Sequence, residues 1–232
     1  MSVQNATAAD GLIGMMNVFV DPASTAKRVP GRWSWVSPVI VLSSIYVVFG
    51  YLMLPYAMQM VDARMAQQNL PPERIENAKR IAHTFSQFSI VLTPAFVIGF
   101  LALTAWLIVV SGSVVGTGGR FRDVFSLTAA CSIITALQYI ASYVVLRSKG
   151  DEIQSAEQLQ PPFGLDILTS DLHGPLLAIL NFFSIFEIWY LVVLGLGLAV
   201  LTGSSKSRAF LAITPAWLLP LAYKIIASLF SR

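Results

Sequence analysis

The chain has 232 residues, of which 56% are hydrophobic and 12% are charged. Soluble domains carry about 25% charged residues, so this composition indicates an integral membrane protein and leaves no room for a soluble catalytic domain. The net charge of +3 is small and the basic residues form no dense run, so we expect no nucleic-acid partner. The single cysteine, Cys131, excludes an intrachain disulfide.

Residues 1–35 form a polar-to-mixed leader that contains the apolar stretch LIGMMNVFV. Asp21 and Pro22 follow this stretch and supply an N-cap residue and a first helical position. We therefore predict a short helix on the sequence ASTAKRV, lying at the membrane surface as an interfacial N-terminal helix. We assign the basic and aromatic anchoring positions of the leader to Lys27, Arg28, Trp33 and Trp35.

Five apolar runs are long enough to cross a bilayer, which takes about 20 helical residues. In chain order they are residues 36–57, 88–111, 124–146, 181–202 and 209–229. We predict an all-α polytopic membrane protein in which residues 36–232 form one bundle of five transmembrane helices. The stretch LPPERIENAKRIAHTFSQF repeats apolar residues at helical spacing, so it predicts an amphipathic extension of the second span.

Proline and small residues within the runs predict how the helices bend and pack. Pro94 should kink the second span, and Pro215 and Pro220 should kink or interrupt the fifth. Small residues at four-residue spacing predict faces on which helices approach closely. These residues are Ala95 and Gly99 in the second span, Ser132 and Ala136 in the third, and Gly195, Ala199 and Gly203 in the fourth.

The loops predict the orientation of the bundle in the membrane. Residues 112–123 and 203–208 are short, rich in glycine and basic, whereas residues 58–87 and 147–180 are longer and carry most of the acids. The overall count of lysine and arginine is equal on the two sides, but the short loops hold their basic residues close to the span ends. We therefore expect the N-terminus in the cytoplasm and the C-terminus outside.

The sequence offers no catalytic constellation. The two histidines, His83 and His173, lack metal-binding spacing, and neither lies in a span where it would serve as a base for a serine nucleophile. The turn GTGGR at residues 116–120 has no following lysine and serine or threonine, so it is not a phosphate-binding loop. We predict no catalytic residue, no metal site and no cofactor.

Glu187 is the acid in the fourth run, NFFSIFEIWYLVVLGLGLAVLTG. Counting about 20 core residues back from Gly203 places it about 6 Å inside the outer hydrocarbon boundary, beside Trp189 as an aromatic anchor. Three interpretations remain open: a hydrogen-bonded structural acid facing the bundle, a proton or ligand site, or solvation at the interface. Gln138 and Asn181 are its candidate partners. Lys224, near the end of its span, is expected to snorkel to the headgroups.

Several short motifs occur in a characteristic order. They are NVFVDPASTAKRV in the leader, Pro38 at the start of the first span, GGRFRDVFSLTA after the glycine turn, and Phe186-x-x-Trp189 followed by Leu194-Gly195 and Leu201-Thr202-Gly203. Over nearly the whole chain this order resembles the Yip family, the Ypt/Rab-interacting membrane proteins, and more closely its bacterial branch. The resemblance implies a bundle of five spans with a cytosolic N-terminus, in the cytoplasmic membrane of a bacterium.

The sequence departs from the family pattern in two places. Bacterial members often show the pattern D-x-F-x-x-W, whereas this chain has Ser184 at the acidic position and Glu187 three residues later, on the same helix face. This shift favours a structural role for the acid. Eukaryotic relatives are adaptors that engage prenylated small GTPases through a long N-terminal domain. Since the leader is short here, that binding is not carried over, and neither is the motif-like DLHGP at residues 171–175.

From these observations we predict a non-enzymatic membrane adaptor or organiser, or a subunit of a larger membrane complex involved in membrane organisation or trafficking. Its expected partners are the lipid bilayer and other membrane proteins or a second copy of the chain. The alternative is a small transporter or permeation pathway that uses Glu187. Transporters favour structural repeats and polar groups at the bilayer midplane, and no repeat is visible in this chain.

Overall fold

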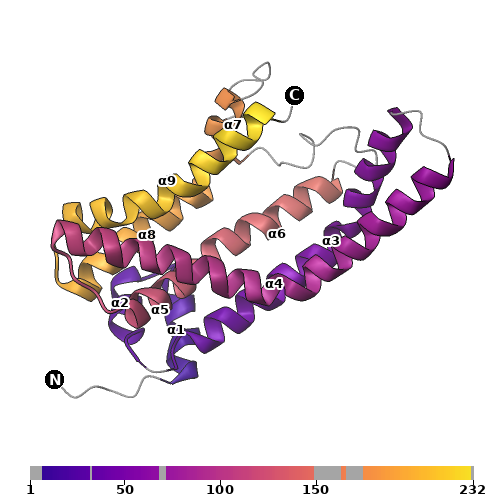
Figure 1. Ribbon diagram of the computed structural model, residues 1–232. Coiled ribbons are helices and arrows are strands. Elements are labelled where there is room, and N and C mark those ends of the chain that lie inside the picture. The colour runs from indigo at the N-terminus through magenta and orange to yellow at the C-terminus, as the bar shows by residue number, and fades with distance from the viewer. Residues whose placement is uncertain (1–6, 32, 68–71, 149–162, 166–174, 231–232) are drawn as a thin grey trace.

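The computed structural model describes residues 7–31, 33–67, 72–148, 163–165 and 175–230, and Figure 1 shows the arrangement of their helices. Within these residues the chain forms helices and no strand, so the prediction of an all-α fold is confirmed. The helices are α1 (Ala8–Asn17), α2 (Pro22–Arg28), α3 (Val36–Gln67), α4 (Pro72–Val115), α5 (Phe121–Cys131), α6 (Ile133–Ser148), α7 (Pro175–Phe182), α8 (Ile185–Thr202) and α9 (Lys206–Phe230).

Five helical segments are long and apolar enough to cross a membrane, as the sequence predicted. They are Val36–Asp62, Glu73–Val115, Phe121–Ser148, Ile185–Thr202 and Lys206–Ile226. The predicted extension of the second span is also confirmed, because α4 is one continuous helix of 44 residues. Pro215 and Pro220 lie inside α9, so the fifth span runs through them without interruption.

The two short turns between spans lie at the same end of the bundle as α1 and α2, and we call this the short-loop end (Figure 1). Gly116 and Gly118, between α4 and α5, have φ of 75° and 48°, and Gly203, after α8, has φ of 65°. Side chains other than glycine rarely adopt this left-handed conformation. The glycines therefore let the chain reverse direction within a few residues. The opposite end, where α3 and α4 meet, is the long-loop end.

The third span is divided at Ser132, between α5 and α6. The Ser132 hydroxyl donates to the carbonyl of Thr128 at 2.8 Å, and the Thr128 hydroxyl donates to the carbonyl of Val124 at 2.9 Å. Serine and threonine that bond back to the preceding turn in this way often bend a helix. Because the hydroxyls remain hydrogen-bonded, the break leaves neither polar side chain exposed to lipid.

The leader forms two helices, and α2 begins as predicted. The Asp21 carboxyl group accepts the backbone N–H groups of Ala23 and Ser24 at 3.1 and 3.2 Å, and Pro22 occupies the first helical position. Helix α1 was not predicted. At its start the backbone N–H and hydroxyl of Thr7 donate to Asp10, and these hydrogen bonds lower the pKa of Asp10 below its ordinary value.

The leader packs into the bundle with one face, which differs from a helix that only rests on the membrane surface. Val18, Thr25 and Val29 are fully buried, and helix α2 packs against α8 while α1 packs against α3 and α5. The Thr25 hydroxyl donates to the carbonyl of Gly14 at 2.9 Å and joins α2 to α1. The apolar stretch of the leader was visible in the sequence. The helices that it packs against were not, because they are distant in the chain.

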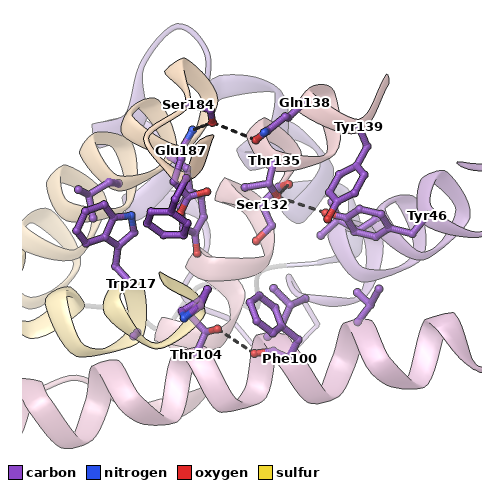
Figure 2. Close-up of a pocket in the computed structure, with 18 of the residues that line it drawn as sticks. Tyr46, Phe100, Thr104, Ser132, Thr135, Gln138, Tyr139, Ser184, Glu187 and Trp217 are labelled. Atoms are coloured by element: carbon purple, nitrogen blue, oxygen red, sulfur yellow. Dashed lines mark hydrogen bonds between the residues drawn. The ribbon is translucent and has the colours of Figure 1, made fainter. Parts of the chain in front are cut away.

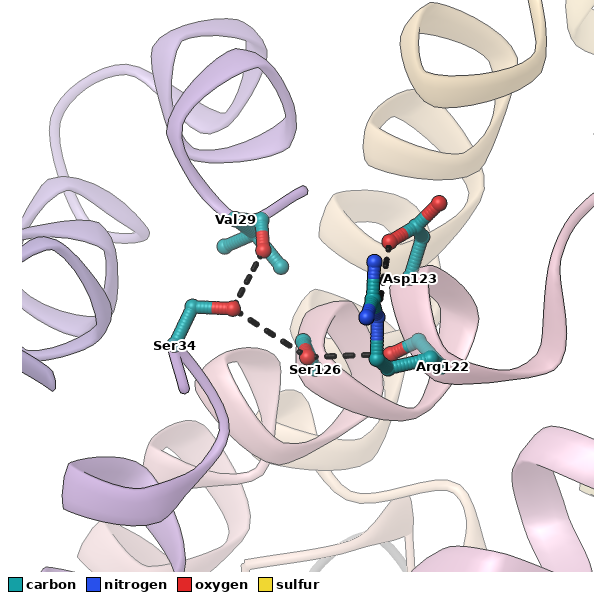
Figure 3. Close-up of polar contacts among 5 residues, drawn as sticks. All are labelled: Val29, Ser34, Arg122, Asp123 and Ser126. Atoms are coloured by element: carbon teal, nitrogen blue, oxygen red, sulfur yellow. Dashed lines mark hydrogen bonds and ion pairs between the residues drawn. The ribbon is translucent and has the colours of Figure 1, made fainter. Parts of the chain in front are cut away.

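The linker between α2 and α3 is fixed to α5 by polar contacts (Figure 3). The buried Ser34 hydroxyl donates to the carbonyl of Val29 and lies 3.3 Å from the Ser126 hydroxyl oxygen, which itself donates to the carbonyl of Arg122 at 2.9 Å. Gly11 of α1 lies directly against the same linker, because a Cβ atom at this position would stand 1.9 Å from the carbonyl oxygen of Ser34. Helix α1, the linker and α5 thus form one packed unit.

We predict that Gly11→Ala destabilises the protein by about 1 to 3 kcal/mol, the usual cost of overpacking, because the added methyl group collides with backbone. Thermal unfolding in detergent measures the change, and limited proteolysis of the leader shows whether α1 detaches. Gly99→Ala is the matched control, since a Cβ atom there meets nothing within 4 Å. Equal stability of both variants would contradict the packed position of α1.

Candidate functional site

A cavity of about 900 Å³ lies between the spans, lined by residues of α3, α4, α6, α7, α8 and α9. Its walls are mostly apolar and aromatic, and include Leu42, Phe49, Phe96, Phe100 and Leu101. A small number of polar side chains converge on the same space. This combination of size, apolar walls and few polar groups is typical of ligand-binding sites.

One wall of the cavity is a polar stripe on the third span, which begins at Ser132, just before α6, and continues along α6. Ser132, Thr135, Gln138 and Ser142 recur at intervals of three or four residues, which places them on one helix face. The hydroxyls of Thr135 and Ser142 donate to the carbonyls of Ser132 and Gln138 at 2.8 and 2.7 Å, as Ser132 does to Thr128. A hydroxyl has two acceptor lone pairs besides its proton, so these oxygens keep acceptor capacity toward the cavity.

Ser184 connects α8 to this stripe at the break between α7 and α8 (Figure 2). Its hydroxyl accepts the backbone N–H of Glu187 at 3.0 Å as the N-cap of α8, and donates to the side-chain oxygen of Gln138 at 3.3 Å. Ser184 is buried, with 1% of its surface exposed. One hydroxyl thus determines where α8 begins and how that start lies against α6.

Glu187 lies in the cavity between α6 and α9, with Trp217 and Lys224 on the α9 side. The side chains of Glu187 and Lys224 both line the cavity, and they form no ion pair with each other. The Lys224 side-chain nitrogen lies 5.5 Å from the ring centre of Phe182, a cation–π distance. An acid and a base therefore face the cavity without closing it.

The indole nitrogen of Trp217, also at the cavity, lacks a hydrogen-bond acceptor among the described residues. It is buried and has no partner at hydrogen-bond geometry, although it interacts more weakly with the carboxyl group of Glu187. Figure 2 shows the indole beside Glu187. A buried donor without an acceptor costs about 1 to 3 kcal/mol, so this N–H is a place where an acceptor from outside the chain would add stability.

Glu187 is the third residue of the Ile185–Thr202 span, and α8 runs without a break from there to Gly203. The shallow position counted from Gly203 therefore stays a prediction. The fourth run was predicted as one continuous span over residues 181–202, whereas α8 starts only after Ser184 and α7 precedes it, packed on α9. The structure thus adds a helix break just before the acid.

The structure brings Gln138, Asn181 and Glu187 together on the walls of one cavity, as the sequence suggested. Their roles remain predictions. Sequence reasoning missed Trp217 and gave Lys224 only a snorkelling role. The stripe on α6 was visible in the sequence as polar residues at helical spacing, but nothing in the sequence indicated which helix it would face.

The predicted small-residue positions of the fourth span have different environments. Gly195 and Ala199 are buried, and a Cβ atom at Gly195 would stand 2.6 Å from the ring of Phe210 on α9. Gly203 differs from the expected packing role: it is the left-handed C-cap of α8, and no atom lies within 4 Å of a Cβ built there. Glycine at this position therefore allows the turn after α8 and makes no contact between helices.

The predicted anchoring residues also divide into two groups. Lys27, Arg28 and Trp33 are exposed, which is compatible with an interfacial position. Trp35 is partly buried and packs edge-to-face on Phe125 at 5.8 Å between ring centres, so it differs from the expected surface anchor. Trp189 packs in the same way on Phe19 of the leader, at 5.4 Å.

Among the residues that the structure describes, no group of three histidines, cysteines or acids is placed to hold a metal ion. His173 and Asp171, in the DLHGP stretch, lie outside the described residues.

We predict that Ser184→Ala lowers stability by about 1 kcal/mol or more, because α8 loses its N-cap and the link to Gln138. Chemical unfolding in detergent micelles measures this loss. Ser44→Ala is the matched control, since the Ser44 hydroxyl donates only to the carbonyl of Ile40 within its own helix. A Ser184→Ala protein as stable as the control would show that the hydroxyl does not fix the start of α8.

Comparison with known proteins supports the resemblance inferred from the motifs. The chain matches the Yip1 domain over residues 16–227. It is also similar to the membrane protein YknW of Bacillus subtilis (strain 168), with 24% identity over 213 residues that cover 90% of this chain and 87% of that protein. No solved structure matches the chain. Because the match extends over nearly all of the chain, this protein belongs to the Yip1 domain family and is an integral membrane protein.

Proposed function

We propose that this chain is a non-enzymatic membrane adaptor, or a subunit of a larger membrane complex, that holds a component of the membrane in the cavity between its spans. The observation that supports it is the cavity of about 900 Å³ between the spans, in which a few polar groups stand among apolar walls. Polar side chains within a membrane are costly, and they mark ligand or transport sites when they face a cavity.

The size of the cavity suits part of a macromolecule or lipid. A helix about 10 Å across occupies roughly 120 Å³ per residue, so 900 Å³ corresponds to about two helical turns. Such a volume also accommodates the polar headgroup of one lipid with the first part of its chains. Either occupant would give the aromatic side chains of the cavity walls the packing contacts that they otherwise lack.

The outer surface of α4 supports a complex with other membrane proteins. Ala95 and Gly99 were predicted contact residues, yet both are exposed, and no atom lies within 4 Å of a Cβ built at Gly99. The small residues of α8 are used inside the bundle, whereas these two remain open toward the bilayer. Small residues on a lipid-facing helix allow another helix to approach closely.

A small transporter or permeation pathway is the second candidate, and one observation favours it. Glu187 faces the cavity, and the polar stripe on α6 lies along the same space. Transporters bind their substrates near the bilayer midplane. The adaptor is the better supported of the two, because no repeat is visible in the sequence, whereas many transporter folds contain one.

We predict that the chain, purified in a gentle detergent, retains a stoichiometric protein or lipid, and that Thr104→Phe loses it. Thr104 lines the cavity and is 8% exposed, so a phenylalanine there fills part of the space. Leu103→Phe is the matched control, since the adjacent Leu103 is 44% exposed and does not line the cavity. Mass spectrometry identifies the bound component. A wild-type chain that always purifies alone, without self-association, would refute the adaptor.

For the transport alternative we predict a flux of small cations or protons across reconstituted vesicles that Glu187→Gln reduces by about tenfold or more, as expected for loss of a charged ligand. The measurement uses an internal pH or ion indicator, with empty vesicles as the background. Wild-type and Glu187→Gln proteins that both stay at the background flux would end this alternative.

A further inference from the structure

We propose that the cavity binds the zwitterionic headgroup of an aminophospholipid, with its ammonium group against Glu187 and α6 and its phosphodiester against Trp217 and Lys224. This inference rests on the proposed function and deepens it by naming the occupant. The acyl chains would remain along the apolar walls and in the surrounding bilayer. The argument depends on how hydrogen-bond donors and acceptors are separated across the cavity.

One side of the cavity is rich in acceptors, and we call it the acceptor wall: Ser132, Thr135 and Ser142 of the third span with Glu187 of α8. The three hydroxyls donate their protons to backbone carbonyls of their own segment. Thr135 also lies 3.3 Å from the hydroxyl of Tyr46, which leaves each oxygen at least one lone pair. An ammonium group carries three N–H donors and no acceptor, so it complements this wall.

The other side carries donors, and we call it the donor wall: Trp217 and Lys224 of α9. The indole N–H is buried without a partner at hydrogen-bond geometry. The ammonium of Lys224 contacts the Phe182 ring but makes no ion pair among the described residues. A phosphodiester has only acceptor oxygens at neutral pH and one negative charge, so it is a suitable partner for either group.

The two walls adjoin at Glu187: Figure 2 shows the Trp217 indole on one side of the acid, and Ser132, Thr135 and Gln138 on the other. Glu187 and Lys224 both line the cavity and form no ion pair with each other. Lys224 is seven residues beyond Trp217 on α9, which is about 10 Å nearer the long-loop end at 1.5 Å per residue. Opposite charges staggered in depth match a headgroup in which positive and negative groups are joined by a short linker.

The chemistry selects among common membrane lipids. A lipid with a glycerol headgroup offers a phosphate to the donor wall but nothing positive to Glu187. A choline headgroup is positive but has no N–H to donate to the acceptor wall. A primary ammonium next to a phosphodiester satisfies both walls, so phosphatidylethanolamine is the expected occupant.

The test uses the full chain, incubated with vesicles of equal parts phosphatidylethanolamine, phosphatidylcholine and phosphatidylglycerol, then extracted in detergent and weighed by native mass spectrometry. We expect one retained phosphatidylethanolamine per chain. Glu187→Gln and Lys224→Met should each reduce its occupancy by about tenfold, since each removes a charge-assisted hydrogen bond. Lys224→Arg should keep it. The matched controls are Glu73→Gln and Lys206→Met, at exposed positions outside the cavity.

Equal retention of the three lipids, or unchanged phosphatidylethanolamine occupancy in Glu187→Gln and Lys224→Met, would overturn the inference. Folding of each variant is checked by circular dichroism and gel filtration. If Lys224→Met fails to fold, Lys224→Arg still tests the inference, because loss of the lipid in Lys224→Arg also counts against the proposed site. A protein partner retained without any lipid would refute the lipid site and leave the adaptor intact. A chain that retains neither would refute the adaptor as well.

Discussion

The hydroxyl of Ser184 is the contact on which the candidate site depends. It caps α8 by accepting the N–H of Glu187 and holds that helix start against Gln138 of α6. Within lipid no water is present to satisfy the end of a helix, so a break between two helices is tolerated only where side chains take the place of the lost backbone partners. The break therefore occurs beside the polar stripe of α6, and it directs Glu187 into the cavity.

The long elements of this fold follow from the sequence, because a run of about 20 apolar residues has few alternatives to a membrane-spanning helix. The start of α2 was also predictable, since Asp21 and Pro22 act on adjacent backbone groups. Such features depend on residues close together in the chain. The break at Ser184 was not predictable in this way, because residues 181–202 read as one continuous apolar helix. Only the packing of α7 on α9 and the contact with Gln138 reveal the break.

The contacts of the leader and of Lys224 could not be predicted either, because they too depend on residues that are distant in the chain. Gly11 and Gly14 bring α1 against the linker and α2. Two glycines in an apolar stretch indicate a close contact, but they do not show which segment makes it until the position of Ser34 is known. Lys224 is near the end of its span, and a snorkelling lysine satisfies the sequence equally well. A role for Lys224 at the cavity could not be inferred in this way. It depends on Glu187, 37 positions earlier in the chain, which lies on a helix that packs against α9.

The two halves of the bundle have different kinds of packing, and this difference bears on function. Toward the short-loop end, the leader, α5 and α8 pack closely, with Val18, Val29, Leu127 and Leu198 fully or almost fully buried. Farther along the bundle the close packing gives way to the cavity between the acceptor and donor walls. Tightly packed interiors tolerate few arrangements, so the cavity is the part of the bundle with room for another molecule. Phe19 of the leader packs on Trp189, two residues from Glu187, so the leader contacts α8 directly beside the cavity.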